Sequence, residues 1–159
     1  MNRLWAPWRI KYIKNTKNKK CIFCVALKSK RQNYIILKTK YSASMLNIFP
    51  YNNGHTMVFP LRHIKDLSQL KETEILDLFT NLNYTKKLLD KVLSPDGYNI
   101  GINLSEAAGA GLACHMHIHI VPRWRGDTNF MPTIYNTKII SQSLDELYKQ
   151  LRNARPKAD

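Results

Sequence analysis

The 159-residue chain is 44% hydrophobic and 10% aromatic, which is typical of one globular domain with a buried core. The formal net charge is +14, and no run approaches the roughly 20 apolar residues of a bilayer span, which argues against a membrane-spanning protein. No apolar signal segment follows the first residues, so we expect a single cytoplasmic domain over residues 1–159 with no membrane partner.

The positive charge is concentrated in the first part of the chain. Residues 1–65 hold 14 lysines and arginines and no acidic residue, whereas residues 66–159 hold 11 basic and 11 acidic residues. Such a field attracts polyanions, including nucleotides, nucleic acid and anionic surfaces. Solvated lysines without a function would produce the same excess, so the charge alone does not separate these alternatives.

The first part of the chain predicts an extension followed by three strands. Residues 1–20 begin with the amphipathic, aromatic LWAPWRIKYI and end with NTKNKK, which is typical of an exposed loop. We expect this N-terminal extension to pack across the domain or its partner. Strand character follows at 33–39, 43–49 and 55–60, and the turn residues of 50–54 predict a hairpin between the last two.

A long helix is predicted over residues 72–93, where apolar side chains recur at helical spacing until SPDG ends the pattern. These apolar positions are Ile75, Phe79, Leu82, Leu89 and Val92.

Two strands and a last helix complete the predicted fold. We expect strands at 97–104 and over the segment that begins at His115, and a helix at 141–154 with Ser141 or Ser143 as its N-cap. The pattern predicts an α+β domain with a mostly antiparallel five-stranded sheet, one long helix and a C-terminal helix.

The segment HMHIHIVPRW, residues 115–124, places a histidine at every second position. In a strand the three histidines share one face, and the three apolar residues between them share the other. A solvent-facing polar edge is the alternative. Alternate residues of a strand lie about 6.8 Å apart, so three in a row converge poorly on one ion, and divided roles are favoured. The histidines are His115, His117 and His119, and the residues between them are Met116, Ile118 and Ile120.

Cys21 and Cys24 form a CxxC pair, which is a common half-site for structural zinc. Zinc takes four nitrogen or sulfur ligands, so the other half would come from histidine, with His63 and His115 as candidates. A redox pair or a coincidence of spacing is the alternative. Cys114 is expected to be a buried thiol, because it points away from the histidine face.

His117, in the middle of the triad, is then available for chemistry. Imidazole is a competent nucleophile toward phosphorus, and its second nitrogen can be oriented by a hydrogen bond. Gly109 and Gly111 precede the strand, and their backbone N–H groups can approach an anion without a Cβ in the way. Beside the triad, these glycines predict a phosphate-binding loop, although AGAG alone is also typical of a turn.

Several segments resemble the histidine triad family of nucleotide hydrolases and transferases. HMHIHIV fits the family signature, in which three histidines alternate with apolar residues. LWAPWR, CIFC, NGHTMVFPLRHI, GYNIGINLSEAAGAG and VPRWRGDTNF extend the resemblance over about residues 1–135. They look like the bacterial branch, which is related to the fragile-histidine-triad dinucleoside polyphosphate hydrolases and the diadenosine tetraphosphate phosphorylases.

The resemblance implies a fold, an assembly and a reaction. It implies a histidine-triad fold, a homodimer whose sheets join across the interface, and cleavage of dinucleoside polyphosphates at the α-phosphate by hydrolysis or phosphorolysis. AMP is a product of the hydrolysis. In the family the middle histidine forms a covalent nucleotidyl intermediate, which maps onto His117, while His119 orients or polarises its surroundings. A nucleoside phosphoramidase and a non-catalytic protein that binds nucleotides or nucleic acid are the alternatives.

The resemblance also implies site residues. The structural Zn²⁺ of members with CxxC maps onto Cys21, Cys24, His63 and His115, the set that the spacing also favours. Substrate contacts map onto Asn47, which matches a ribose-binding asparagine, onto Asn103 near the phosphates, and onto Gly109, Gly111, His117 and His119. Many relatives carry a hydroxyl or amide side chain where Gly111 stands, so only a backbone N–H is expected from this position.

Overall fold

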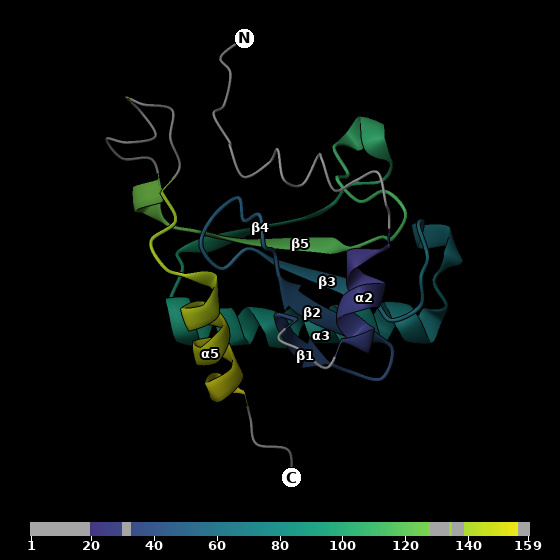
Figure 1. Cartoon of the computed structure of the whole chain (residues 1–159), viewed down its shortest axis with the longest axis horizontal. Coiled ribbons are helices and arrows are strands. Elements are labelled where there is room, and N and C mark those ends of the chain that lie inside the picture. Colours follow the sequence, from purple (N-terminus) through teal and green to yellow (C-terminus); the bar gives the residue numbers. More distant parts are fainter. Residues whose placement is uncertain (1–19, 30–32, 128–133, 135–138, 156–159) are drawn as a thin grey trace.

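A five-stranded antiparallel sheet forms the centre of the fold (Figure 1). This computed structural model describes residues 20–29, 33–127, 134 and 139–155. The strands are β1 (Ile35–Lys38), β2 (Ser42–Leu46), β3 (Thr56–Pro60), β4 (Gly97–Ile102) and β5 (Ile118–Arg123). They lie in the order β1-β2-β3-β5-β4, and every neighbouring pair is antiparallel. The predicted α+β fold with this sheet is confirmed.

Helices pack on both faces of the sheet. The helices are α2 (Ile22–Lys28), α3 (Glu72–Leu93) and α5 (Leu144–Ala154), and the short 3-10 turns are η1 (Leu67–Gln69), η2 (Glu106–Ala108) and η3 (Arg125–Asp127). In Figure 1, α2 lies in front of the strands and the long α3 runs behind them. The sheet therefore separates two apolar clusters.

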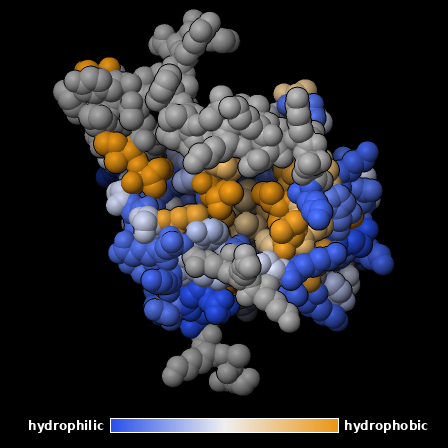
Figure 2. All heavy atoms as spheres, viewed as in Figure 1, coloured by the Kyte–Doolittle hydropathy of each residue, from blue (hydrophilic) through white to orange (hydrophobic). Residues whose placement is uncertain are grey.

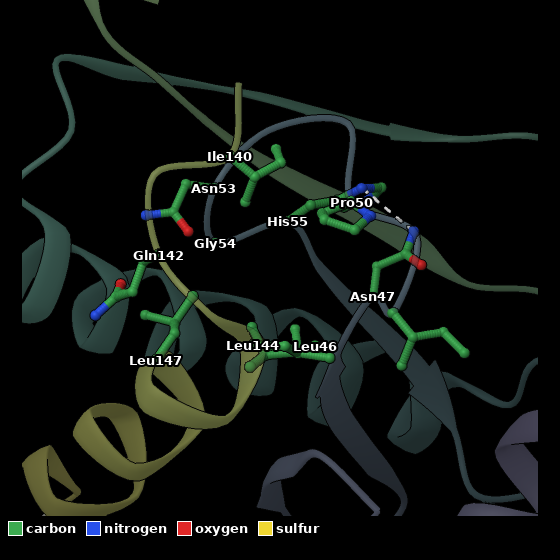
Figure 3. A pocket seen from close by; sticks show the side chains of 11 residues that line it. Leu46, Asn47, Pro50, Asn53, Gly54, His55, Ile140, Gln142, Leu144 and Leu147 are labelled. Carbon is green, nitrogen blue, oxygen red and sulfur yellow. Dashed lines mark hydrogen bonds between the residues drawn. The ribbon is translucent and has the colours of Figure 1, made fainter. Parts of the chain in front are cut away.

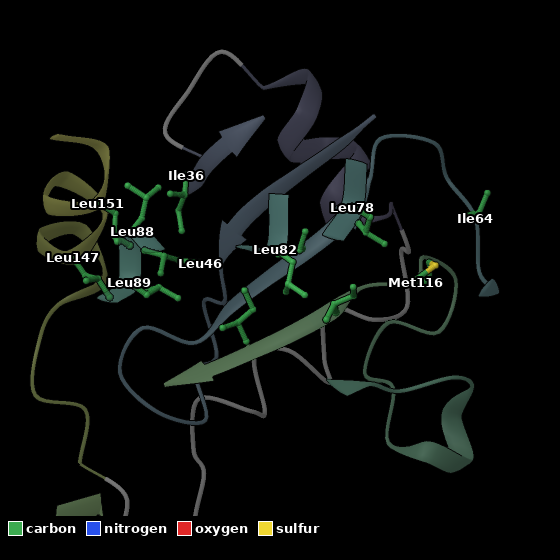
Figure 4. Close-up of a cluster of buried hydrophobic side chains, with 13 residues drawn as sticks. Ile36, Leu46, Ile64, Leu78, Leu82, Leu88, Leu89, Met116, Leu147 and Leu151 are labelled. Atoms are coloured by element: carbon green, nitrogen blue, oxygen red, sulfur yellow. The ribbon is translucent and has the colours of Figure 1, made fainter. Parts of the chain in front are cut away.

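The larger cluster fills the space between the sheet, α3 and α5 (Figure 4). The side chains of Leu46, Ile118 and Ile120 reach it from the strands, because alternate residues of a strand point to the same face. Leu89 of α3 and Leu151 of α5 are fully buried there. This cluster is the main core of the domain.

The smaller cluster lies on the opposite face, under α2. Phe23 of α2 is fully buried and stacks on Phe59 of β3, with ring centroids 4.2 Å apart. Met45 and Met57 belong to the same cluster. Figure 2 shows apolar atoms on the face that α2 covers, where Val25 is partly exposed, and hydrophilic atoms on either side of it.

Buried polar side chains join α3 to β2 and the turn before it. Asn81 is fully buried, donates from Nδ2 to Ser42 Oγ at 3.0 Å, and accepts from Thr85 Oγ1 at 3.1 Å. Thr85 Oγ1 also lies 2.9 Å from Ser44 Oγ, and Asp77 accepts from Ser42 Oγ at 2.7 Å. Buried polar groups cost free energy unless they are hydrogen-bonded, so these pairs fix how the helix sits on the sheet.

The predicted boundaries agree closely with the structure in the second half of the domain. The long helix over 72–93 is α3 itself, and Ser143 caps α5 by accepting a hydrogen bond from Glu146 N. The hairpin of β2 and β3 is also confirmed. Two of the predicted apolar positions of the long helix differ: Ile75 and Phe79 are exposed, because the buried face of the helix passes through Leu78 and the predicted Leu82.

Three points about the N-terminal part and the helices remain. The 1–20 extension lies outside the described residues, apart from the exposed Lys20. Helix α2 was not predicted, because seven residues with two buried side chains carry little periodic signal. Among the described residues, no helix is long and apolar enough to cross a bilayer.

We expect Asn81→Ala to lower the free energy of unfolding by about 1–3 kcal/mol, because it leaves buried hydroxyl groups without their partner. Asn83→Ala, at an exposed position of the same helix, is the matched control and should change stability by less than about 0.5 kcal/mol. Urea denaturation followed by circular dichroism measures both. Equal stability of the two variants would show that the network does not hold the helix.

Candidate functional site

The three triad histidines gather on the α2 side of the sheet, but only His119 lies within a strand. β5 begins at Ile118, so the strand starts later than the His115 that the pattern predicted. The reason is that the segment before Ile118 bonds to a loop instead of a strand: Met116 N donates to Ile64 O at 2.8 Å. The residues between the histidines nevertheless point to the opposite side, as predicted, since Met116, Ile118 and Ile120 all belong to the main core.

His115 meets the two cysteines and His63 at one point. Its Nδ1 lies 3.2 Å from Cys21 Sγ and 3.8 Å from Cys24 Sγ, and Cys24 Sγ lies 3.3 Å from His63 Nδ1. The four donor atoms all lie within 4.8 Å of one another, so this cluster can hold a metal ion. The structure thus brings together the four residues expected to bind zinc.

The two sulfur and two nitrogen atoms, and the distances between them, fit a metal ion with tetrahedral coordination. Ideal zinc–sulfur and zinc–nitrogen bonds of about 2.3 and 2.0 Å at a tetrahedral angle place sulfur and nitrogen about 3.5 Å apart. The three sulfur–nitrogen distances of 3.2, 3.3 and 3.8 Å lie around this value. Burial raises the pKa of the Cys21 thiol to about 11, so a bound cation must displace a proton from this sulfur.

Contacts behind the cluster hold its two histidines. His115 Nε2 lies 2.9 Å from Pro60 O and donates to it, which leaves the Nδ1 lone pair facing the cysteines. The loop that carries His63 is held by its neighbour Arg62, whose guanidinium bonds Glu74 at 2.7 Å. This contact holds the pKa of Glu74 at about 2, so the ion pair persists at neutral pH.

Helix α2 brings the cysteines to the histidines. Phe23, between the two cysteines, packs against the rings of His115 and His117 at centroid distances of 5.2 and 5.1 Å. The prediction that Cys114 is a buried thiol is wrong, since its side chain is exposed. It precedes the buried stretch and belongs to a loop, so the alternation of a strand does not apply to it.

His117 is held so that one ring nitrogen remains available. Its Nδ1 lies 3.0 Å from His115 O, and because a carbonyl only accepts, Nδ1 carries the proton. The lone pair of the neutral ring is therefore on Nε2. Burial lowers the pKa of His117 below its ordinary value, which favours this neutral form. An oriented neutral imidazole is a nucleophile that needs no deprotonation.

His55 is a site residue that the sequence patterns did not reveal. It is 1% exposed, and its Nε2 lies 2.9 Å from His119 Nδ1. Figure 3 shows it beside Asn47, whose side chain it contacts at 3.2 Å. One feature of the sequence could have indicated His55. It stands two residues before Met57 and four before Phe59, so the three side chains share the face of the sheet that also carries His119.

The other residues expected to contact substrate differ in burial and backbone conformation. Asn47 is buried, and its Oδ1 accepts from Phe49 N at 2.9 Å. Asn103 follows β4 and is half-buried, while Gly111 is exposed. Gly109 has the left-handed φ of +85°, which favours glycine, and its N–H donates to Glu106 O at 2.9 Å. The roles of these four residues remain predictions.

Two cavities lie near this region, and neither is lined by His117. One, of about 50 Å³, lies beneath the β2–β3 turn and is too small for a nucleotide (Figure 3). The other, of about 590 Å³, is open and lies between Lys65 and the loop of residues 104–113. Its size suits a small-molecule ligand, and it adjoins the loop that leads to His115.

Comparisons with known proteins identify the family of the chain. The family model described as HIT domain matches residues 28–126. The AP-4-A phosphorylase of Mycobacterium tuberculosis is 33% identical over 161 residues, covering 95% of this chain and 83% of the relative. The asymmetrical bis(5'-nucleosyl)-tetraphosphatase of Schizosaccharomyces pombe is 34% identical over 102 residues, covering 64% of this chain and 56% of the relative. A zinc-bound histidine triad family protein from Mycobacterium smegmatis has a TM-score of 0.69 and 26% identity, covering 85% of this chain and 92% of that one.

The chain belongs to the HIT domain family, as its sequence resemblance indicated. The two relatives above that are named for an activity are enzymes, and the expectation of a HIT-family enzyme is confirmed.

We expect protein purified without added metal to carry about one equivalent of metal per chain, measured by elemental analysis. Cys24→Ser should lose the metal and lower the free energy of unfolding by more than the roughly 1 kcal/mol of an ordinary substitution, because metal binding contributes folding free energy. Cys114→Ser is the control and should keep both metal and stability, since Cys114 is exposed and lies outside the cluster. A fully folded wild-type protein without metal would contradict the site.

Proposed function

We propose that the protein cleaves dinucleoside polyphosphates of the diadenosine tetraphosphate type at an α-phosphate, through a covalent nucleotidyl intermediate on His117. The observation that carries this proposal is the hydrogen bond from His117 Nδ1 to His115 O, which leaves an Nε2 lone pair on a buried, neutral ring. The named activities of the M. tuberculosis and S. pombe relatives support the substrate class.

In the proposed reaction, Nε2 of His117 attacks the α-phosphorus and the bond to the bridging oxygen breaks. The rest of the polyphosphate chain leaves, and water or inorganic phosphate then displaces the nucleotide from Nε2. The carbonyl of His115 stabilises the cationic ring of the intermediate through the same hydrogen bond. His119, whose ring centroid lies 4.7 Å from that of His117, is the nearest imidazole to the reacting group.

Other residues are proposed to bind the substrate. Asn47 would contact the ribose, using the amide hydrogen that does not face His55, and Asn103 would contact the phosphates. The loop with Gly109 and Gly111 would line the phosphate side. The basic N-terminal half would favour an anionic ligand.

We propose Zn²⁺ as the ion of the metal cluster, because two thiolates and two imidazoles in a closed set of four are typical of structural zinc. The zinc-bound M. smegmatis structure supports this assignment. Bound zinc would supply folding free energy and no chemistry, since no ligand position is left for substrate. Its effect on the reaction is to fix His115, and with it the carbonyl that orients His117.

A homodimer joined through β4 is proposed as the assembly. At the other edge of the sheet, Arg155 covers β1 by donating to Ile36 O at 3.0 Å. β4 pairs with β5 on one side only, among the described residues, and an unpaired edge is a template for a second chain. Ile100 of β4 is 46% exposed, so this edge strand carries an exposed apolar side chain.

The reaction is tested with diadenosine tetraphosphate, with and without inorganic phosphate. ATP with AMP is expected from hydrolysis and ATP with ADP from phosphorolysis. A phosphoramidase would use the same intermediate with an amine leaving group. An adenosine phosphoramidate substrate, tested in parallel, therefore distinguishes this alternative from cleavage of dinucleoside polyphosphates. His117→Asn should keep the fold and lower kcat by about three to six orders of magnitude, as the loss of a nucleophile does elsewhere.

Trapping the adenylated protein and locating the label by mass spectrometry identifies the nucleophile. His119→Asn serves as the comparison and should slow turnover less while keeping the label on His117. An adenylate on His115 or His119, or near-normal turnover of His117→Asn, would show that the nucleophile is wrongly assigned.

Multi-angle light scattering tests the dimer. Wild-type protein should show twice the 18.5 kDa mass of one chain, and Ile100→Glu should shift it to the monomer, because a charge would be buried at the joined edge. Leu67→Glu is the matched control at another exposed apolar residue and should stay dimeric. A wild-type monomer at micromolar concentration, or a dimeric Ile100→Glu protein, would argue against this interface.

A further inference from the structure

We propose that Cys21 and Cys24 form a reversible oxidation site, in which a peroxide converts the two thiolates of the metal cluster into a disulfide and the cation is released. The release of the cation rests on the proposed metal, and the effect on turnover rests on the proposed function. The formation of the disulfide is a property of the protein alone and can be measured without a substrate.

The two sulfur atoms lie close enough to react with each other. They belong to a set of four donor atoms that all lie within 4.8 Å of one another. A disulfide requires Cβ atoms about 3.8 Å apart, whereas residues three positions apart on a helix have Cβ atoms about 5–6 Å apart. Cys21 is the N-cap of α2, and its backbone lies outside the helical region, with a ψ of 122°. Its side chain can therefore turn toward Cys24 while the rest of α2 stays helical.

The cluster is open to solvent on the side of Cys24. His63, whose Nδ1 lies 3.3 Å from Cys24 Sγ, is exposed, and the two cysteines are half-buried. On the other side His115, which lies 3.2 Å from Cys21 Sγ, is fully buried. An oxidant in solution therefore reaches Cys24 first, and Cys21 is the second thiol that completes the disulfide.

The oxidation has two steps, and one peroxide molecule supplies both. The Cys24 thiolate attacks a peroxide oxygen, the O–O bond breaks, hydroxide leaves, and a sulfenic acid forms. The Cys21 thiolate then attacks this sulfur, the S–O bond breaks, and a second hydroxide leaves. Two thiolates thus lose two electrons, and hydrogen peroxide is reduced to two hydroxide ions. A small dithiol returns the two electrons by thiol–disulfide exchange and regenerates both cysteines.

The disulfide takes both sulfur ligands from the cluster. Structural zinc requires four nitrogen or sulfur ligands, and only thiolate sulfur binds it well. After oxidation two imidazoles remain, which is half of a ligand set. Disulfide formation and loss of the cation therefore accompany each other.

Phe23 connects the two cysteines to the triad. It stands between them in the sequence, is fully buried, and packs against the ring of His117 at a centroid distance of 5.1 Å. Closing the disulfide draws together the two ends of the turn that carries Phe23. The ring of His117 then loses a closely packed neighbour, so the oxidised protein holds the proposed nucleophile less firmly.

Peptide mapping of the full-length, metal-containing protein tests the site. The protein is treated with hydrogen peroxide, its free thiols are alkylated, and trypsin then cuts after Lys20 and Lys28. The resulting peptide, CIFCVALK, contains both cysteines and should be unalkylated and lighter by two hydrogen atoms. A chromophoric zinc chelator should report about one equivalent of released metal, compared with untreated protein. A dithiol added before alkylation should restore the labelling of both cysteines.

Two variants identify the thiols that react. Cys114→Ser should behave like the wild type, because Cys114 is exposed and lies outside the cluster. Cys24→His keeps a nitrogen ligand at this position but removes one of the two thiols. It should keep its metal when peroxide is added, whereas the wild type loses it.

Turnover of a dinucleoside polyphosphate provides the second readout. Oxidation should lower kcat by about 10- to 100-fold, as is typical when partners that orient a functional histidine are lost. A dithiol with added zinc should restore kcat. Cys24→His should turn over at the same rate before and after the peroxide treatment.

The outcomes separate this proposal from the proposed function. Alkylation of both Cys21 and Cys24 after peroxide treatment, or a disulfide that forms while the metal stays bound, overturns the oxidation site. A complete disulfide with unchanged kcat overturns its link to His117. The wild-type peptide map decides the first of these outcomes, even if a variant does not fold. If the disulfide forms and the metal is released, but the reduced protein cleaves no dinucleoside polyphosphate, the proposed function fails and the oxidation site stands.

Discussion

The antiparallel pairing of β3 with β5 determines on which side of the sheet Ile118, His119 and Ile120 lie. Ile118 pairs with Val58 and His119 with Met57, so the two isoleucines face α3 while His119 faces α2. A slip of one residue would exchange the two faces, because the side-chain period of a strand is two. It would bury the imidazole of His119 in the main core and expose the isoleucines. Core packing and site geometry therefore depend on one register.

His115 connects the two parts of the site through three different atoms. Nδ1 faces the cysteines, Nε2 is bonded to Pro60 O, and the backbone oxygen accepts from His117. The residue that anchors the metal cluster thus also orients the proposed nucleophile. His115 and His117 were expected to have separate roles. In the structure they lie next to each other, and a hydrogen bond joins them.

Periodic patterns predicted the parts of the fold in which residues pack against a regular element. The long helix, the hairpin and the α+β class followed from them, and CxxC with the alternating histidines indicated the metal cluster. Contacts between distant residues were harder to predict: Cys21 and His115 are 94 positions apart. The contact of His55 with His119 was missed because the two residues are 64 positions apart, and no spacing rule reports the partner of a ring nitrogen.

Helix α2 is anchored to the rest of the molecule by few apolar side chains. Only Phe23 and Ala26 of its seven residues are buried, and they belong to the smaller cluster, which the sheet separates from the main core. Elements with few buried contacts open locally at a lower free energy than the whole domain unfolds. A cation bound between α2 and His115 would suppress this opening by mass action, since the open form lacks a complete ligand set. The amide hydrogens of α2 would then exchange with solvent at a rate that depends on metal concentration, whereas those of α3 would exchange independently of it.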